Sequence, residues 1–193
     1  MDEADLIVAA FVILVWGAVF GFLFFRSKAH EDRLTFQAEK RGGTFVKGGL
    51  FKQAELRIPF KEWTVVISPI PGSRYRSSRT VAQVRVDAPR LPIILMERNY
   101  LLQKILAAFG RERLLTGDEE FDHRWVMRTS DTLAAHKLVT AEFKEKLEER
   151  ILRTLVVKIQ PLELSLIIAA IPSNDEEYDI FIETIFLVLR KFL

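Results

Sequence analysis

An uncharged apolar run near the start of the chain limits what this sequence can fold into. Residues 6–25 read LIVAAFVILVWGAVFGFLFF, with no charged residue and no proline. At about 1.5 Å per residue, a helix of this length matches the roughly 30 Å hydrocarbon layer of a bilayer. The run therefore predicts a transmembrane helix at residues 6–25.

The residues on either side of this run indicate an orientation. Residues 1–5 contain no basic residue, whereas Arg26, Lys28 and Arg33 follow the run closely. A cleaved signal peptide would have a basic start and a small-residue cleavage site, so we expect an uncleaved anchor. The positive-inside rule predicts a single-pass protein of the bacterial inner (cytoplasmic) membrane, with residues 1–5 outside and the C-terminal domain in the cytoplasm.

Small residues within the run are candidates for helix–helix contact. Gly17 and Gly21 form a G-x-x-x-G pair, and Ala10 and Leu14 share their helical face. This pattern lets two membrane helices approach closely, although it is also common by chance. Ala10, Gly17 and Gly21 are therefore candidate self-association residues.

Residues 26–43 are expected to form a juxtamembrane helical stalk. Their composition favours a helix with mixed charges and few large apolar residues, and Gly42 and Gly43 are expected to end it. We favour a solvated spacer over a partner-binding coil.

Beyond the two glycines the hydrophobic period changes to two, which is typical of strands. The expected strands are residues 44–47, 54–58, 63–68, 80–86, 91–96, 124–129, 154–159 and 162–171. Turn residues separate them, among them Pro59 and the stretch from Pro69 to Ser73. The short connections favour antiparallel neighbours.

Helical periodicity appears in four places. We expect helices at residues 100–109, from Ser130 or Asp131 to about 138, from Thr140 to about 151, and from a cap at Ser173 to the C-terminus. Glu176 would complete a capping box in the last of these. The prediction is one α+β domain at residues 44–193, with a mainly antiparallel sheet and a C-terminal helix.

Residues 115–151 contain a motif of acidic, aromatic and small residues. Its members are Asp118, Phe121, Asp122, Trp125, Asp131, Ala134, Ala135 and Thr140. The motif resembles that of uncharacterised bacterial membrane-anchored families of no known activity, which share an acidic turn, Phe-Asp, an aromatic residue, a strand, an Asp, an Ala-rich helix and a Leu-Thr-Pro helix start. Trp125 replaces the usual Phe, and Ala141 replaces the usual Pro. The resemblance implies an architecture and a localisation, and the residues themselves predict turn-holding, core and capping roles.

Composition and motifs argue against several chemistries. There is no cysteine, the net charge is only +2, and no nucleophile or nucleotide-binding motif is present. We therefore expect no nucleic-acid partner, no cofactor, no catalytic residue and no enzyme activity. A divalent-metal site at the acidic group from Asp118 to His123 is a less favoured alternative.

The most suggestive local feature is a basic hairpin tip. Arg74, Arg76 and Arg79 lie in one predicted turn and are candidate contacts for phosphates or lipid headgroups, against the alternative of a solvated hairpin. The apolar side of residues 100–109 is open to two interpretations, a core-covering helix or one at the membrane interface.

These observations favour a single-pass membrane-anchored accessory or interaction protein, for example a subunit of a larger membrane complex. The expected partners are the lipid bilayer and either another protein or a second copy. The alternative function is a lipid-headgroup-responsive domain that resembles pleckstrin-homology folds in architecture only. An unrecognised metal-dependent enzyme is the third hypothesis.

Overall fold

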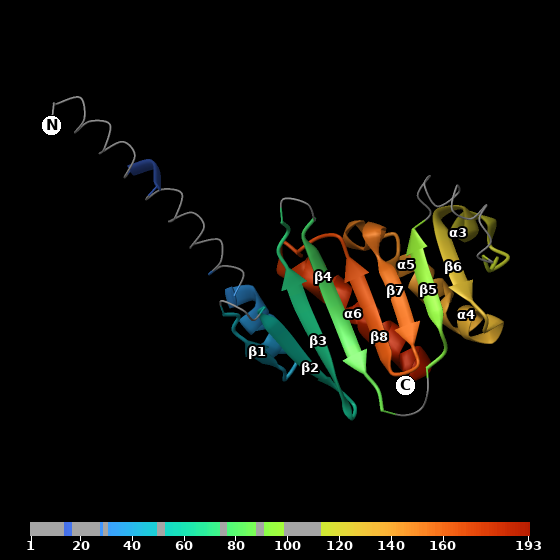
Figure 1. Cartoon of the computed structure of the whole chain (residues 1–193), viewed down its shortest axis with the longest axis horizontal. Coiled ribbons are helices and arrows are strands. Elements are labelled where there is room, and N and C mark those ends of the chain that lie inside the picture. Colours follow the sequence, from blue (N-terminus) through green and yellow to red (C-terminus); the bar gives the residue numbers. More distant parts are fainter. Residues whose placement is uncertain are drawn as a thin grey trace.

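An antiparallel sheet of eight strands organises the computed structural model, which describes residues 14–16, 28, 31–49, 53–73, 77–87, 91–98 and 113–193. Its strands are β1 (Thr44–Val46), β2 (Glu55–Phe60), β3 (Trp63–Ile70), β4 (Arg79–Arg85), β5 (Ile94–Arg98), β6 (Trp125–Thr129), β7 (Val156–Gln160) and β8 (Glu163–Ile168). They lie in the order β1-β2-β3-β4-β8-β7-β5-β6 (Figure 1). The predicted α+β fold with an antiparallel sheet is confirmed.

Two prolines that were expected to separate strands lie inside them. Pro59 belongs to β2 opposite Thr64, and Pro69 belongs to β3 opposite Thr80. β1 pairs only with residues 55–57, so Pro59 lies where β2 has one paired side. Pro69 likewise lies beyond the part of β3 that pairs with β2. Each proline thus lies where its strand has one unpaired side, and prolines within sheets are confined to such places.

The outer sides of the two edge strands differ. β1 has only three residues. Beside β6, the Leu114 N–H donates to the carbonyl of Met127 over 2.9 Å, and the Arg113 guanidinium donates to the carbonyl of Trp125 over 3.1 Å. Residues 113 and 114 thus occupy part of the outer side of β6.

The described helices are α3 (Glu119–Arg124), α4 (Thr132–Leu138), α5 (Ala141–Lys146), the 3-10 helix η1 (Arg150–Thr154) and α6 (Asp175–Phe192). Asp131 caps α4 and Thr140 caps α5, as predicted. Helix α3 was not predicted, and its last residue, Arg124, was expected to begin the strand at residues 124–129. The helix predicted at residues 100–109 lies outside the described residues, so its two interpretations stay open.

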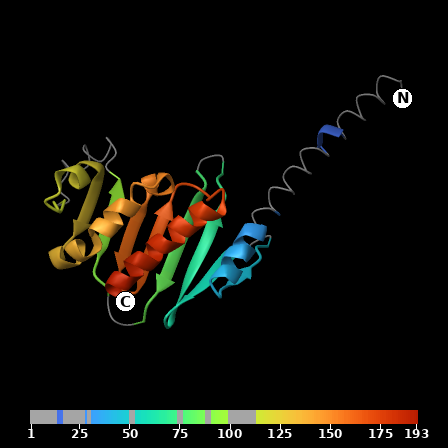
Figure 2. The ribbon, with the colours of Figure 1, turned by 180° about the vertical axis from the view of Figure 1, so that it is seen from behind.

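Helix α6 crosses one face of the sheet diagonally (Figure 2). Its N-cap is Asn174, whose side chain accepts from the Glu177 N–H over 2.8 Å, while the Glu177 carboxylate accepts from Ser173. The N-cap therefore lies one residue later than predicted, and Glu177 rather than Glu176 accepts from the residue ahead of it. Tyr178, Phe181, Ile182, Ile185, Leu187, Val188 and Leu189 of this helix are buried. The core thus lies between α6 and the inward-facing residues of the sheet.

The helix at residues 31–40 packs on this domain. Leu34 and Gln37 are fully buried, and Ala38 is 3% exposed. Lys40 forms an ion pair with Asp179 of α6 at 2.7 Å, and Arg41 forms a second one with the same carboxylate. This part of the predicted stalk is therefore part of the core rather than a solvated spacer.

Acid should weaken this attachment. Burial raises the pKa of Asp179, but the hydrogen bonds and the positive charges of Arg41 and Lys40 together lower it by more, so the net pKa lies below its ordinary value. Because the folded pKa is the lower one, the stabilisation is fully present above the unfolded pKa of about 3.9 and is lost as the pH falls through the folded pKa. We expect the stability difference between wild type and Asp179→Asn, measured by urea unfolding, to be largest at neutral pH and to shrink below about pH 4. Glu176→Gln, which changes an exposed carboxylate of the same helix, is the control. A difference that persists to about pH 2 would contradict the assignment.

The predicted transmembrane helix requires a correction. Among the residues that the structure describes, no helix combines the length and the apolar content needed to cross a bilayer. The longest described helix, α6, has 18 residues, carries acidic residues in its first turn and basic ones in its last, and buries its apolar side chains in the core. This finding contradicts the predicted spanning helix, the single-pass character and the inner-membrane localisation with the N-terminus outside. Of residues 6–25 themselves, only Leu14, Val15 and Trp16 are described, and the rest lie outside the described residues.

Candidate functional site on the uncovered sheet face

The sheet face opposite α6 is not covered by any element within the described ranges (Figures 1 and 2). A row of apolar side chains crosses it: Val81 of β4 lies opposite Ile167 of β8, which lies opposite Val156 of β7. All three are partly exposed. This row lies toward the end of the sheet where the β3–β4 hairpin turns.

The same strands become polar toward their other end. Arg85 of β4 lies opposite Glu163 of β8, and Lys158 of β7 lies opposite Ser165. The uncovered face is therefore divided along the strands into an apolar hairpin end and a charged far end.

A hollow of about 540 Å³ lies at the hairpin end of the apolar row. Ile70, Val156 and Ile167 supply apolar lining from three strands, and Ala169 extends it beyond β8. Three serines and Arg79 add polar groups from the hairpin; the serines are Ser73, Ser77 and Ser78. The hollow thus combines an apolar surface with hydroxyls and one cation.

Hydrogen bonds fix the walls of this hollow. The Ala169 N–H donates to the Thr154 hydroxyl oxygen over 2.9 Å, and the Thr80 hydroxyl donates to the Ala170 carbonyl over 2.8 Å. Across the hairpin, the Gly72 N–H donates to the Ser78 hydroxyl oxygen over 3.2 Å. Hydrogen bonds therefore fix the backbone around the hollow next to β4, β8 and η1.

Arg79 is the one predicted hairpin arginine that the described residues include. It is the first residue of β4, is exposed, and lines the hollow. Arg74 and Arg76 lie outside the described residues. Residues 63–86 contain four arginines and no Asp or Glu, so this stretch of the sequence is strongly basic.

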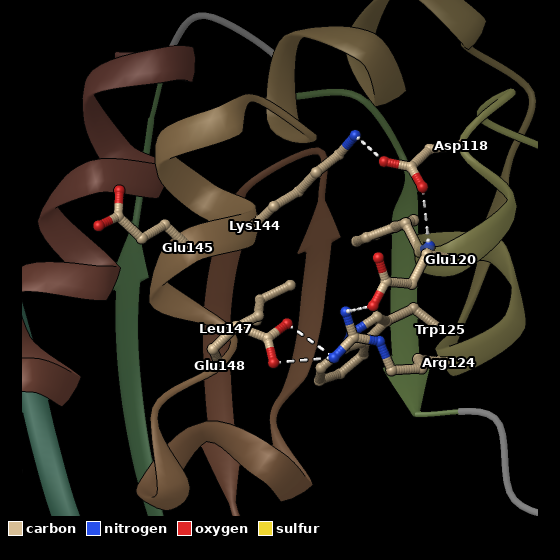
Figure 3. A pocket seen from close by; sticks show the side chains of 9 residues that line it. Asp118, Glu120, Arg124, Trp125, Lys144, Glu145, Leu147 and Glu148 are labelled. Carbon is tan, nitrogen blue, oxygen red and sulfur yellow. Dashed lines mark hydrogen bonds and ion pairs between the residues drawn. The ribbon is translucent and has the colours of Figure 1, made fainter.

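A smaller cavity of about 200 Å³ lies between α3 and α5 on the helix-covered side (Figure 3). Its charged side chains pair with one another. Lys144 bonds to Asp118, while Arg124 bonds to Glu120 at 3.0 Å and to Glu148 at 2.7 Å. These pairs join α3 to α5 and the turn that follows it.

The pKa values reflect the same pairing. The hydrogen bond from Lys144, together with one from the Phe121 N–H, holds the pKa of Asp118 below its ordinary value. The hydrogen bond to Glu148 raises the pKa of Arg124. Both groups therefore stay charged at neutral pH. This cavity is smaller than the usual 300–1,000 Å³ range of ligand pockets, so we assign it a structural role.

The acidic residues of the motif hold turns and cap helices, as predicted. The Asp122 carboxylate accepts from the Thr116 N–H, the Thr116 hydroxyl and the Gly117 N–H, at 3.0 to 3.2 Å. Asp118 accepts from the Phe121 N–H at 3.0 Å, and Asp131 from the Ala134 N–H at 2.9 Å. The aromatic pair, Phe121 and Trp125, is buried and stacked with ring centroids 6.5 Å apart.

The remaining site predictions are placed as follows. Within the described parts of the chain, no group of three or more His, Asp or Glu side chains is arranged to hold a metal ion, and this includes the residues from Asp118 to His123. The candidate self-association residues Ala10, Gly17 and Gly21 lie outside the described residues.

Comparisons with known proteins add one structural likeness. No protein-family model matches the chain, and no curated protein does. The motif resemblance to uncharacterised families therefore stays a prediction. The chain is similar to the crystal structure of the mycobacterial trehalose monomycolate transport factor A, TtfA, with a TM-score of 0.49 and 12% identity over 85% of this chain and 96% of that one. At this score and identity, nothing about the role of this chain follows from the likeness.

Proposed function

We propose that this chain is a non-catalytic accessory protein that binds an anionic lipid surface through the hairpin end of its uncovered sheet face. The observation that carries the proposal is the hollow, whose apolar lining from β3, β7 and β8 adjoins Arg79. A lipid surface offers the same two features, anionic headgroups above apolar chains. Arginine is well suited to phosphate because its guanidinium can donate two parallel hydrogen bonds.

The charge of the hairpin supports the same ligand. Residues 63–86 carry four positive charges and no negative one. Each basic residue near an anionic lipid surface contributes about 1 kcal/mol of attraction at physiological salt. On the other side of the sheet, the charged groups between α3 and α5 pair with each other, which supports a structural rather than a catalytic use of that cavity.

Replacing the three hairpin arginines tests this proposal. The triple variant Arg74→Ser, Arg76→Ser and Arg79→Ser of the full chain should bind vesicles of phosphatidylglycerol and phosphatidylcholine about 100-fold more weakly, since about 3 kcal/mol of attraction is removed. Co-sedimentation with vesicles measures the change. Pure phosphatidylcholine vesicles show how much binding is independent of charge.

Arg190→Ser is the matched control, because Arg190 is an exposed arginine on α6, on the covered side of the sheet. It should leave vesicle binding unchanged. Equal binding of the triple variant and wild type to the anionic vesicles would overturn the proposal and would favour a protein or a second copy as the ligand of this face.

A further inference from the structure

We propose that the hollow beside Arg79 takes up a single-chain anionic amphiphile, such as a fatty-acid anion, with its hydrocarbon chain on the apolar lining and its anionic group at Arg79. This inference deepens the proposed function and rests on it for the class of ligand. The difference from the proposed function is that the hollow binds a single amphiphile molecule in solution, without a lipid surface.

The size and lining of the hollow fit such a molecule. Its volume of about 540 Å³ lies within the usual 300–1,000 Å³ range of ligand pockets. Ile70, Val156 and Ile167 come from three strands and face the same space, so the lining is a formed surface rather than one exposed side chain. A hydrocarbon chain gains by contact with it roughly in proportion to the apolar area removed from water.

Charge selects an anionic head over a cationic one. Arg79 is the one charged side chain that lines the hollow among the residues that the structure describes. Among the acidic residues on the same face, Glu97 pairs with Arg128 at 2.5 Å and Glu55 pairs with Arg57 at 2.7 Å. Glu163 lies opposite Arg85, at the end of β4 away from the hollow. A carboxylate or phosphate at the hairpin therefore meets positive charge without a competing acid.

The hydroxyl groups on the hairpin side of the hollow favour a ligand head that accepts hydrogen bonds. Ser73, Ser77 and Ser78 carry hydroxyls beside Arg79. Apart from Thr154, the rest of the lining is apolar. This disfavours a ligand that is polar throughout, such as a sugar or a free nucleotide, because its buried groups would lose their hydrogen bonds to water. An amphiphile with one anionic end satisfies both parts of the hollow.

Decanoate and 1-decanol form a matched pair of probes, since they share a hydrocarbon chain and differ in charge. Isothermal titration of the full chain should show decanoate binding tighter than decanol. Across octanoate, decanoate and dodecanoate, affinity should rise about fourfold for each methylene that enters the hollow. Arg79→Ser should weaken decanoate about fivefold and leave decanol unchanged, as expected for one exposed ion pair.

Ala169→Trp fills the hollow from an exposed position without changing the charge, and Ala169→Phe is a smaller version should the first fail to fold. Both should weaken decanoate and decanol at least tenfold while vesicle binding, which depends on the arginines, is retained. Decanoate binding that is insensitive to Arg79→Ser and to the Ala169 variants would overturn the inference. If decanoate binding is insensitive to these variants but the triple arginine variant loses vesicle binding, the proposed function stands. Only the assignment of the hollow as an acyl-chain site is then overturned.

Discussion

The free energy of unfolding is expected to fall by about 3 kcal/mol when Leu34 is replaced by alanine, as for other fully buried leucines. Leu34 lies on the helix at residues 31–40, ahead of the first strand, and is fully buried. Its loss would leave a cavity at the place where this helix meets the rest of the core. Urea unfolding of the full chain, followed by circular dichroism, measures the change.

Phe36→Ala is the matched control, because Phe36 lies on the same helix and is 48% exposed. It removes more carbon than Leu34→Ala but should lower stability by less than about 1 kcal/mol, since surface changes have small effects. Similar losses for the two variants would contradict the packing of this helix on the domain.

The second large effect is expected at Gly43, where alanine should lower stability by about 3 kcal/mol, at the upper end of overpacking effects. A Cβ atom at this position would meet the backbone carbonyl oxygen of Arg57 well within 3.0 Å, and the Cα of Ile58 at 3.2 Å. These neighbours are backbone atoms of β2, so they have no rotamer that relieves the contact. The whole β1–β2 pairing would have to shift.

Gly42→Ala separates this steric effect from backbone conformation. Gly42 has a φ of +62°, and a Cβ atom at this position would have no neighbour within 4 Å. Its substitution therefore brings backbone strain without a steric clash. We expect it to lower stability by about 1 kcal/mol. Thermal unfolding of both variants shows which one loses more stability. A larger loss of stability for Gly42→Ala would contradict the close approach between Gly43 and the backbone of β2.

The strands were predictable from the sequence because their hydrophobic alternation is local. Residues 63–70 place Val65, Ile67 and Pro69 inward and leave Val66 and Ser68 on the uncovered face, as a period of two requires. The pairing of β4 with β8 was not predictable in this way. The register Thr80 to Ile168 joins residues far apart in the chain, and nothing near either of them specifies the partner.

In the candidate site, too, the residues with local signals were predictable and those brought together by the fold were not. Arg79 was found from its charge and its place in a turn, which are local signals. The apolar lining was not, because Val156 and Ile167 belong to a hairpin far along the sequence and face Arg79 only after the sheet has formed. Helix 31–40 was misread for a related reason, since its three buried residues are too few to give a clear apolar stripe.

The edges of the sheet limit how any partner can attach. Many proteins bind an extended peptide as an additional strand at a free sheet edge, where main-chain N–H and C=O groups have no partner. Here β1 offers only three residues, and Leu114 and Arg113 already occupy carbonyls on the outer side of β6. Short or occupied edges resist the pairing of one molecule with the next. Partner recognition by this domain should therefore depend on side-chain contacts rather than on main-chain hydrogen bonds to an added strand. Single substitutions on the sheet face should then change the binding.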